Sequence, residues 1–459
     1  MKALIQRGWF ALFLLAAVSL PAADTLTWQT KPDRVTADIQ STELLRVLEG
    51  VAKLTGWHVF IESNITTKVS VKFKDLPSGD ALRFLLGDLN YAFVPQTGGS
   101  PRLFVFRTTR ANATIMVQPG DINPGKKLEA TKIPNELIVR LKPGANIDEL
   151  AKKLGAKVVG KIEGLNAYRL QFPDEAAANA ALAELTGNPE VASVENNYVV
   201  DQQPLPQKLD SANAPGPVDL KLDPPNSEAC RVIVGLIDTA VKPSGSVFDK
   251  FLLKSLSVAG EANFDPNSPT HGPSMLQNIV LGASSTSKGS ISMQVLSVDV
   301  YGPNETANTF NVAAGIVAAV NGGANIINLS LGSSGDSQLL HDIIRQVKQK
   351  GIPVFAAAGN NASPDPFFPA GWPEVISVTA GNNGQRATYA NYADYINLMV
   401  PGSAVVYFNN IPYVVSGTST ASALSSGLAG GTAAANCIGT SSAANGLLNT
   451  PALQFKPTK

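Results

Sequence analysis

The feature that most constrains the fold of this 459-residue chain is a series of near-continuous apolar runs in its last half. They cover residues 231–237, 291–298, 324–331, 352–358 and 375–379. A strand buried on both faces of a parallel sheet has this composition. Helical patterns at 310–320 and 338–350 separate several runs. This alternation predicts an α/β domain over 230–459, with an open parallel sheet, helices on both faces and right-handed crossovers.

Two polar residues directly follow strands of this predicted sheet. Asp238 ends the first run, and Asn360 follows the fourth, in Ala-Ala-Gly-Asn. Binding sites in open parallel sheets lie at the carboxyl ends of the strands. We therefore expect Asp238 and Asn360 at one edge of the sheet.

A serine stands where an apolar run changes into a run of small residues. Val414 and Val415 precede Ser416-Gly-Thr-Ser419, and Ala, Ser and Gly dominate 421–435. The small residues predict a buried helix from about residue 418, which puts Ser419 in its first turn. Free N–H groups and the helix dipole there favour developing negative charge, as a nucleophile requires. A simple helix cap is the alternative.

Of the three histidines, one is a candidate catalytic base. His271 is followed by Gly-Pro at a predicted helix start, where proline is tolerated. His58 lies in an apolar strand pattern, which indicates a structural role. His341 lies on an amphipathic helix, where we expect it to face solvent.

Four motifs now stand in one order: Ile-Asp238-Thr-Ala-Val, His271-Gly, Ala-Ala-Gly-Asn360 and Gly-Thr-Ser419. Over 231–436 the chain resembles the subtilisin-like serine proteases, whose triad has this Asp, His, Ser order. The resemblance implies that Asp238, His271 and Ser419 are catalytic and that the Asn360 amide donates to the oxyanion.

The same resemblance implies a substrate-binding strand and no metal in the reaction. Ser330-Leu331-Gly332 would pair with the substrate backbone, and Gly359 would line the same site. No cofactor is required; structural calcium stays open, with no residue assigned. Ala240 and Pro273 depart from the family pattern, which usually has glycine and threonine there. These changes affect rate and specificity more than reaction type.

A second compact unit, residues 131–200, has the predicted order βαββαβ, that of two helices on an antiparallel sheet. Its order, spacing and closing Glu195-Asn-Asn-Tyr-Val-Val200 resemble the propeptide of subtilisin-like proteases. The resemblance implies an inhibitor and folding assistant acting in cis. A ferredoxin-like domain without that role is the alternative. Residues 201–229, with six prolines, predict an exposed tether in which processing would fall.

The chain begins with a basic, then apolar, then small-residue segment at 1–23, the pattern of a signal peptide. Residues 25–108 predict a small α+β module, and residues 109–130 a linker. The module resembles the short N-terminal modules of secretins and TonB-dependent receptors, which implies an envelope protein as partner. We expect an exported protein, either secreted or periplasmic.

Composition bears on the binding partners and on the state of the cysteines. The chain has 36 basic residues (lysine plus arginine) and 36 acidic residues (aspartate plus glutamate). It therefore carries no net positive charge that would indicate binding to nucleic acid. Cys230 and Cys437 are the two cysteines, and export makes a disulfide between them plausible. Two buried thiols remain the alternative.

The prediction is an exported serine endopeptidase that hydrolyses peptide bonds through an acyl-enzyme and is made as an inhibited precursor. The alternative is a catalytically weakened protease-fold binding protein that docks to an envelope assembly through residues 25–108. Labelling by an active-site-directed fluorophosphonate separates the two.

Overall fold

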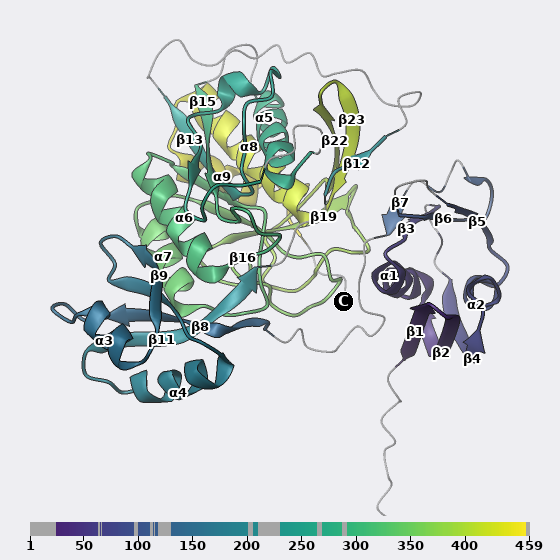
Figure 1. The fold of residues 1–459 in the computed structure, drawn as a ribbon. Helices are drawn as coiled ribbons and strands as arrows, with labels where there is room; N and C mark the ends of the chain where they lie inside the picture. The colour runs from purple at the N-terminus through teal and green to yellow at the C-terminus, as the bar shows by residue number, and fades with distance from the viewer. Residues whose placement is uncertain are drawn as a thin grey trace, which may run out of the picture. The chain divides into compact units, whose positions relative to one another are not determined.

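The computed structural model describes residues 24–455 except 63–64, 66, 96–99, 111–112, 114, 118–129, 201–204, 210–229, 264–268 and 287–291 (Figure 1). The predicted signal peptide lies outside the described residues. The chain divides into two compact units, Met1–Pro124 and Gly125–Lys459, each treated by itself below. Within the described residues, no helix is long and apolar enough to cross a membrane.

The first unit is an α+β module with its own apolar core. One sheet has the order β1-β2-β4 and the other β5-β6-β3-β7. The elements are β1 (Thr25–Thr30), β2 (Asp33–Glu43), α1 (Leu44–Thr55), β3 (His58–Ile61), β4 (Lys68–Leu76), α2 (Ser78–Leu86), β5 (Asn90–Val94), β6 (Arg102–Phe106) and β7 (Ile115–Val117). The predicted helices, the strands at β3 and β4, and the closing hairpin are present.

Two features of this unit differ from the prediction. Strand β7 lies inside the expected linker 109–130 and pairs with β3, so the module extends past residue 108. The hairpin of β1 and β2 was also not predicted. Strand β7 has only three residues, too few for a clear apolar period, and it forms through pairing with β3. Strand β2 does alternate, with Val35, Ala37 and Ile39 buried, but the prediction did not use this signal.

The second compact unit contains two domains, and the smaller has the predicted order βαββαβ. Its elements are β8 (Lys132–Leu141), α3 (Ile147–Lys153), β9 (Lys157–Ile162), β10 (Ala167–Gln171), α4 (Glu175–Leu185) and β11 (Val191–Val200). The four strands form an antiparallel sheet, in the order β11-β8-β10-β9. A fifth strand, β16, joins β11 from the larger domain.

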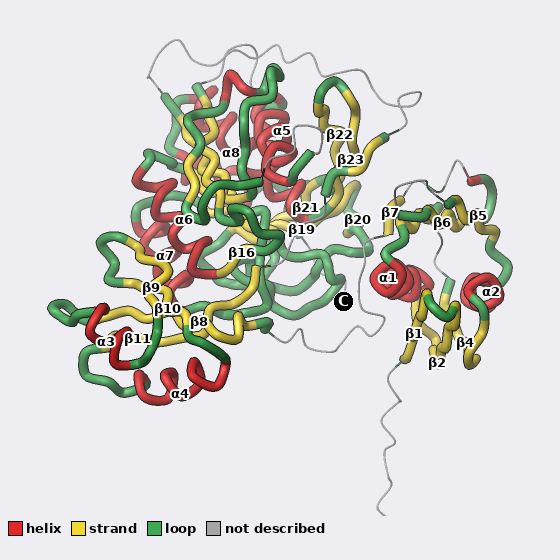
Figure 2. The backbone as a smooth tube through the Cα atoms, viewed as in Figure 1, coloured by secondary structure: helices red, strands yellow, loops and turns green. Residues whose placement is uncertain are grey.

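The larger domain is built on the predicted parallel sheet, in the order β14-β15-β13-β17-β18-β19-β20 with β21 beside β19. Figure 2 labels β19, β20 and β21 among its strands, which are drawn in yellow. All its pairings are parallel except that of β19 with β20. The strands are β13 (Val232–Asp238), β14 (Leu256–Ser257), β15 (Met293–Asp299), β16 (Ala307–Asn308), β17 (Ile326–Leu329), β18 (Val354–Ala357), β19 (Ile376–Asn382), β20 (Gln385–Arg386), β21 (Leu398–Val400), β22 (Ser403–Phe408) and β23 (Ile411–Ser416). The helices are η3 (Asp249–Phe251), α5 (His271–Ser284), α6 (Thr309–Asn321), α7 (Gln338–Gln349), α8 (Thr418–Asn436) and α9 (Thr440–Leu448).

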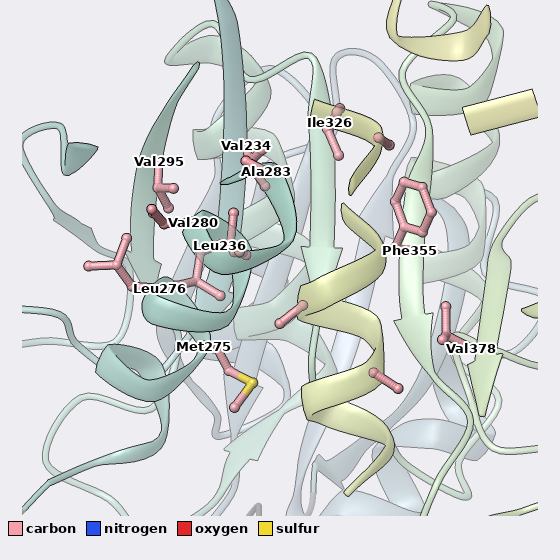
Figure 3. Packing of buried hydrophobic residues seen from close by; sticks show 14 of the residues in the cluster. Val234, Leu236, Met275, Leu276, Val280, Ala283, Val295, Ile326, Phe355 and Val378 are labelled. Atoms are coloured by element: carbon pink, nitrogen blue, oxygen red, sulfur yellow. The ribbon is translucent and has the colours of Figure 1, made fainter. Parts of the chain in front are cut away.

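Helices α5 and α8 cover one face of this sheet, and their side chains interlock with those of the strands (Figure 3). The two helices approach closely because glycines lie at their crossing. A Cβ on Gly427 would collide with the Ile279 carbonyl oxygen, and one on Gly282 would collide with that of Leu424. The small-residue run therefore sets how near the helix that carries Ser419 lies to the helix that carries His271.

Helices α6 and α7 contribute to a second core on the other side of the sheet, and the smaller domain packs into it. Ile138, Ile162 and Val200 of that domain belong to the same cluster of buried residues as the two helices. The smaller domain therefore shares a continuous apolar core with the larger one.

The sequence predicted an exposed tether over residues 201–229, but part of this tether is bound. Gln207–Lys208 form β12, which pairs antiparallel with β23, so this part of 201–229 is bound to the larger domain. Its many prolines gave no sign of this, because the pairing uses backbone groups. The two cysteines, Cys230 and Cys437, are joined in a disulfide with their Cα atoms 4.9 Å apart.

Candidate active site

Asp238 and His271 meet at the carboxyl end of the sheet. Asp238 is the last residue of β13, and His271 is the first residue of α5. The His271 Nδ1 lies 2.8 Å from Asp238 Oδ1 and 2.9 Å from Oδ2, and both side chains are buried, 3% and 1% exposed. The carboxylate thus fixes the ring, and Nε2 is left as the nitrogen that can accept a proton.

The loop after β13 supports this pair through the backbone. The Gly272 N–H donates to the Thr239 hydroxyl at 2.8 Å, and a Cβ on Gly272 would collide with the Thr239 carbonyl oxygen. The Thr239 N–H in turn donates to Asp238 Oδ1 at 2.7 Å. Only glycine lets the helix start approach the strand end this closely.

Ser419 lies in the first turn of α8, as predicted, and is 2% exposed. Its hydroxyl donates to the Ser330 carbonyl at 2.9 Å, and the Ser330 hydroxyl donates to the Ser419 carbonyl at 2.9 Å. This reciprocal pair ties the helix start to the end of β17. Ser330 itself is held by the Asn328 amide at 3.0 Å.

Asn360 is oriented by the residue before Ser419. Its Oδ1 accepts from the Thr418 N–H at 2.8 Å and from the Thr418 hydroxyl at 3.1 Å. Because Oδ1 faces these donors, the amide nitrogen Nδ2 is directed elsewhere as a donor. Gly417 has a φ of +149°, and a Cβ there would lie 3.3 Å from Asn360 Nδ2, so glycine keeps that nitrogen accessible.

The predicted substrate-binding residues lie beside this centre. Ser330, Leu331 and Gly332 follow β17, and all three are buried. Next to them, the Ser333 hydroxyl donates to the Val199 carbonyl of the smaller domain at 2.6 Å. Gly359 has a φ of +103° and its N–H donates to the Thr418 hydroxyl at 3.1 Å.

His271 also lines a pocket. Its lining includes both residues after Asp238, the loop between β15 and β16, and one residue of the tether; it consists of Leu205, Thr239, Ala240, Ala262, Asn263, Thr270, His271, Tyr301, Gly302, Pro303, Asn304 and Glu305. Ala240, where the resemblance leads one to expect glycine, is thus part of the pocket wall.

Some positioning residues had no motif to reveal them. Asn391 accepts from the Asn361 and Ser363 N–H groups at 2.9 and 3.1 Å, and its amide donates to the Ala358 carbonyl. It holds the loop that presents Asn360. Asp299, which ends β15 opposite Asp238, accepts from the next loop; burial raises the pKa of its carboxyl, and the Asp238 charge adds to that rise.

His341 differs from the prediction that it faces solvent. Its ring stacks on Trp372 with centroids 4.4 Å apart, and its Nε2 lies 2.8 Å from Glu374 Oε2. An amphipathic pattern identifies the outer face of a helix but not a loop that covers it. His58 lies in β3 as expected, and burial lowers the pKa of its ring.

The smaller domain caps both helices of the face it covers. The Glu195 carboxylate accepts from the Ser337 hydroxyl at 2.8 Å and from the Gln338 and Leu339 N–H groups at 2.6 and 3.2 Å, at the start of α7. Burial raises the pKa of Glu195 more than these hydrogen bonds lower it.

Asn197 does the same at α6. Its Oδ1 accepts from the Thr309 hydroxyl at 3.1 Å and the Phe310 N–H at 3.2 Å, and its amide donates to Glu136 at 2.8 Å. Asn197 is fully buried. Val199 and Val200, the last two residues of β11, pair with β16 of the larger domain. The smaller domain is therefore built onto the larger one by specific polar contacts, and its chain end lies next to Ser333.

Comparison with known proteins agrees with this arrangement. Residues 230–456 match the subtilase family, peptidase S8, and residues 125–197 match the fervidolysin N-terminal prodomain. The thermophilic serine proteinase of Bacillus sp. strain AK1 is 28% identical over 312 residues, which are 65% of this chain and 77% of that protein.

Two further proteins are matched over smaller shares of their own length. The thermostable alkaline protease of Halalkalibacterium halodurans is 33% identical over 187 residues, 38% of this chain and 51% of that protein. The crystal structure of fervidolysin from Fervidobacterium pennivorans, a keratinolytic enzyme related to subtilisin, has a TM-score of 0.50 and 17% identity, covering 66% of this chain and 54% of that one. At this identity the structural likeness concerns the fold alone.

Fold, site and matches together define a serine-type endopeptidase. The larger domain has the subtilase fold and matches that family over residues 230–456, and the chain carries it as a precursor behind a fervidolysin-type prodomain, which is matched over residues 125–197. The alternative of a weakened binding protein on a protease scaffold is not favoured.

Proposed function

We propose that Asp238, His271 and Ser419 carry out the hydrolysis and that Asn360 stabilises the oxyanion. The observation that carries the proposal is the buried Asp238 carboxylate, which holds His271 Nδ1 through both oxygens. A ring held in this way presents Nε2 as a base, and a charged ring gains from the carboxylate. The placement of Ser419 in the first turn of α8 supports its role as nucleophile.

The reaction then proceeds by general-base and nucleophilic catalysis. Ser419 Oγ attacks the peptide carbonyl carbon, and His271 accepts the hydroxyl proton. Asn360 Nδ2 and the Ser419 N–H donate to the oxygen as it gains negative charge. The C–N bond breaks as His271 gives its proton to the leaving amine. Water, deprotonated by His271, then releases the acyl group as a carboxylate.

Substrate binding is proposed to use the segment after β17. Ser330, Leu331 and Gly332 would pair with an extended peptide, with Gly359 on the other side of the carbonyl to be attacked. Support comes from the prodomain, whose Val199 already binds beside this segment through Ser333. The prodomain end thus approaches the centre as a substrate would, which suits an inhibitor acting in cis.

A fluorophosphonate probe tests the assignment. The probe should label the wild-type protein, and Ser419→Ala should abolish both labelling and peptide hydrolysis. Ser425→Ala is the matched control, because that serine lies in the same helix and its hydroxyl bonds to the Ala421 carbonyl. Labelling that survives in Ser419→Ala would assign the nucleophile elsewhere.

We further propose that the reaction needs no cofactor. The groups named above supply the base, the nucleophile and the oxyanion donors. Activity should survive dialysis against a chelator of divalent cations. A loss that calcium restores would instead indicate a structural calcium site.

Export and docking complete the proposal. Residues 1–23 act as a signal peptide, and the first unit docks the enzyme to an envelope protein, as its resemblance to secretin and TonB-type modules suggests. Exposed Phe84 and Phe93, 57% and 40% exposed, suit a contact surface. Pull-down of envelope proteins by the whole chain and by a variant lacking residues 25–117 tests the docking; equal recovery would contradict it.

A further inference from the structure

A buried asparagine lies in the sheet beneath the helix that carries Ser419. Asn328 is the third residue of β17, between Ile327 and Leu329, and is 0% exposed. Both neighbours belong to the core that includes α6 and α7, so alternation along the strand turns Asn328 to the other face, toward α8. Burying an amide costs free energy unless its donors and acceptors are paired. The partners of this amide therefore indicate its role.

The partners of Asn328 form a chain of hydrogen bonds that ends at Ser419. The Asn328 amide nitrogen donates to the Ser330 hydroxyl at 3.0 Å, and that hydroxyl donates to the Ser419 carbonyl at 2.9 Å. Asn328 Oδ1 accepts from the hydroxyls of Ser422 and Ser426 at 3.2 and 3.3 Å. None of these five residues is more than 2% exposed. The chain therefore joins the first turns of α8 to the end of β17 inside the protein, where hydrogen bonds are strong.

The carbonyl of Ser419 fixes the direction of this chain. A carbonyl only accepts, so the single hydrogen of the Ser330 hydroxyl points to it. The Asn328 atom that faces Ser330 must then be a donor, which places Nδ2 there and Oδ1 beside the serines of α8. A carboxylate at this place would accept on both sides and would compete with the Ser419 carbonyl for the Ser330 hydrogen. The site therefore requires the two unlike ends of an amide.

The orientation of Ser330 matters because Ser330 holds Ser419 at two atoms. Its carbonyl accepts from the Ser419 hydroxyl, and its own hydroxyl donates to the Ser419 carbonyl, both at 2.9 Å. A serine hydroxyl rotates to suit whichever partners it has, so a fixed donor behind it keeps its hydrogen on one acceptor. Asn328 is that donor. The position of the first turn of α8 thus depends on an amide that belongs to another element.

We propose that Asn328 is a positioning residue for the nucleophile and that it acts through Ser330. It sets where the hydroxyl and the N–H of Ser419 lie relative to the carbonyl group under attack. This rests on the proposed function of Ser419 and adds to it a residue from the interior of the sheet. A shift of a reacting group by about 1 Å can cost about a hundredfold in rate. The effect of Asn328 therefore falls on the attack by Ser419, and not on the affinity for substrate.

Asn328→Ala and Asn325→Ala are a matched pair that tests the proposal. Asn325 directly precedes β17, its Oδ1 accepts from the Ile233 N–H at 2.9 Å, and its amide donates to the Arg231 carbonyl at 3.3 Å. Each variant loses a donor and an acceptor, so both should lower the urea midpoint of the Ser419→Ala precursor.

The two variants should differ in reactivity. In the active protein, Asn328→Ala alone should lower kcat and the rate of fluorophosphonate labelling, by about tenfold to a hundredfold, with KM unchanged. Equal losses in Asn328→Ala and Asn325→Ala would overturn the proposal, as would full reactivity of Asn328→Ala or a loss confined to KM.

A milder pair in α8 keeps the proposal testable if Asn328→Ala does not fold. Ser422→Ala removes one donor to Asn328 Oδ1, whereas Ser425→Ala removes a hydroxyl that bonds to the Ala421 carbonyl of its own helix. Alanine suits a helix at both positions. Ser422→Ala should slow labelling by about twofold to tenfold, the value of one net hydrogen bond, and Ser425→Ala should not slow it. Equal labelling rates in the two variants would contradict the proposal.

The route through Ser330 is tested by a double-mutant cycle. Ser330→Ala removes the hydroxyl that links the amide to the Ser419 carbonyl. In that background, Asn328→Ala should slow fluorophosphonate labelling no further, because the two residues act as one unit. Losses that add would show that Asn328 does not act through Ser330.

A readout without catalysis separates failure of this proposal from failure of the proposed function. In the Ser419→Ala precursor, Asn328→Ala should speed amide hydrogen exchange in residues 421–427 of α8, and Asn325→Ala should not. Exchange that is equally slow in both variants would overturn the positioning role, whatever the fluorophosphonate shows. Absent labelling of the wild type would instead contradict the role of Ser419 as nucleophile.

Discussion

The peptidase domain receives an added strand at two places, and the two are held by different means. At β16 the prodomain strand β11 arrives with Glu195 and Asn197, which cap α7 and α6 through side chains. At β23 the tether strand β12 is paired through backbone groups, and Leu209 donates to Pro412. The prodomain contact therefore depends on particular residues, and the tether contact on chain direction and register.

This difference suits two roles. A folding assistant must recognise one partner, which buried and satisfied polar groups achieve because any mismatch leaves them unpaired. A contact made through backbone pairing does not depend on particular side chains and tolerates many of them. Substitutions should accordingly be costly on the prodomain side and mild on the tether side.

The largest effect is expected at Asn197. Asn197→Ala leaves the Phe310 N–H and the Glu136 carboxylate without their buried partner, at a cost of about 2–4 kcal/mol. The urea midpoint of the Ser419→Ala precursor should fall accordingly. Asn179→Ala, at an exposed asparagine of the same domain, is the control. An unchanged midpoint would mean that the contact is not specified by this network.

Gly335 comes next. A Cβ at this position would collide with the ring of prodomain residue Tyr198, so Gly335→Ala should cost about 1–3 kcal/mol by overpacking. Gly446→Ala is the matched control, because a Cβ there meets nothing within 4 Å. Thermal unfolding of the uncut precursor measures both. Equal unfolding temperatures of the two variants would show that the interface rearranges around Tyr198 to make room for the added methyl group.

Glu195 should make prodomain docking depend on pH. Burial raises the pKa of its carboxyl in the docked state, so docking favours proton uptake. The contribution is fully present below the ordinary pKa of glutamate and is lost as the pH rises through the raised value. Relative to Glu195→Gln, the uncut precursor should gain stability as the pH falls through that window.

Hydrogen exchange in the first turn of α7 measures this difference at a series of pH values. Glu190→Gln, at an exposed glutamate, is the control and should leave the pH profile as in the wild type. A difference that shrinks toward acid would reverse the sign and contradict the assignment.

The smallest effect is expected on the tether side. Lys208 is exposed, and β12 is bound through its backbone, so Lys208→Ala should change the urea midpoint by less than about 0.5 kcal/mol in free energy. The position of the processing cut should stay the same. A large loss of stability would show that the tether contact also depends on side chains and would remove the contrast with Asn197.

Much of the peptidase domain was predictable because its signals are local. Apolar runs located β13, β15, β17, β18 and β19, and the small-residue run located α8. Asp238 and His271 were predicted at a strand end and a helix start, and they occupy those positions. Each signal depends on residues close together in the chain, so it survives without knowledge of the partner.

Other features depend on partners far along the chain. β12 and β7 have no period of their own and exist through pairing with β23 and β3. His341 was predicted to face solvent, but Trp372 covers it from another loop. Asn391 carries no motif, yet it holds the loop of Asn360. Backbone pairing and cover by distant loops leave little trace in composition.

The sequence by itself determined the kind of sheet and the strand end and helix start at which the proposed catalytic residues lie, because burial and helix starts impose local patterns. Only the tertiary structure decided that Asp238 binds His271 Nδ1, that Asn197 caps a helix 113 residues further on, and that the tether pairs with β23. Those contacts form only once the folded domain brings backbone and side-chain donors within hydrogen-bonding distance of acceptors that the chain order keeps apart.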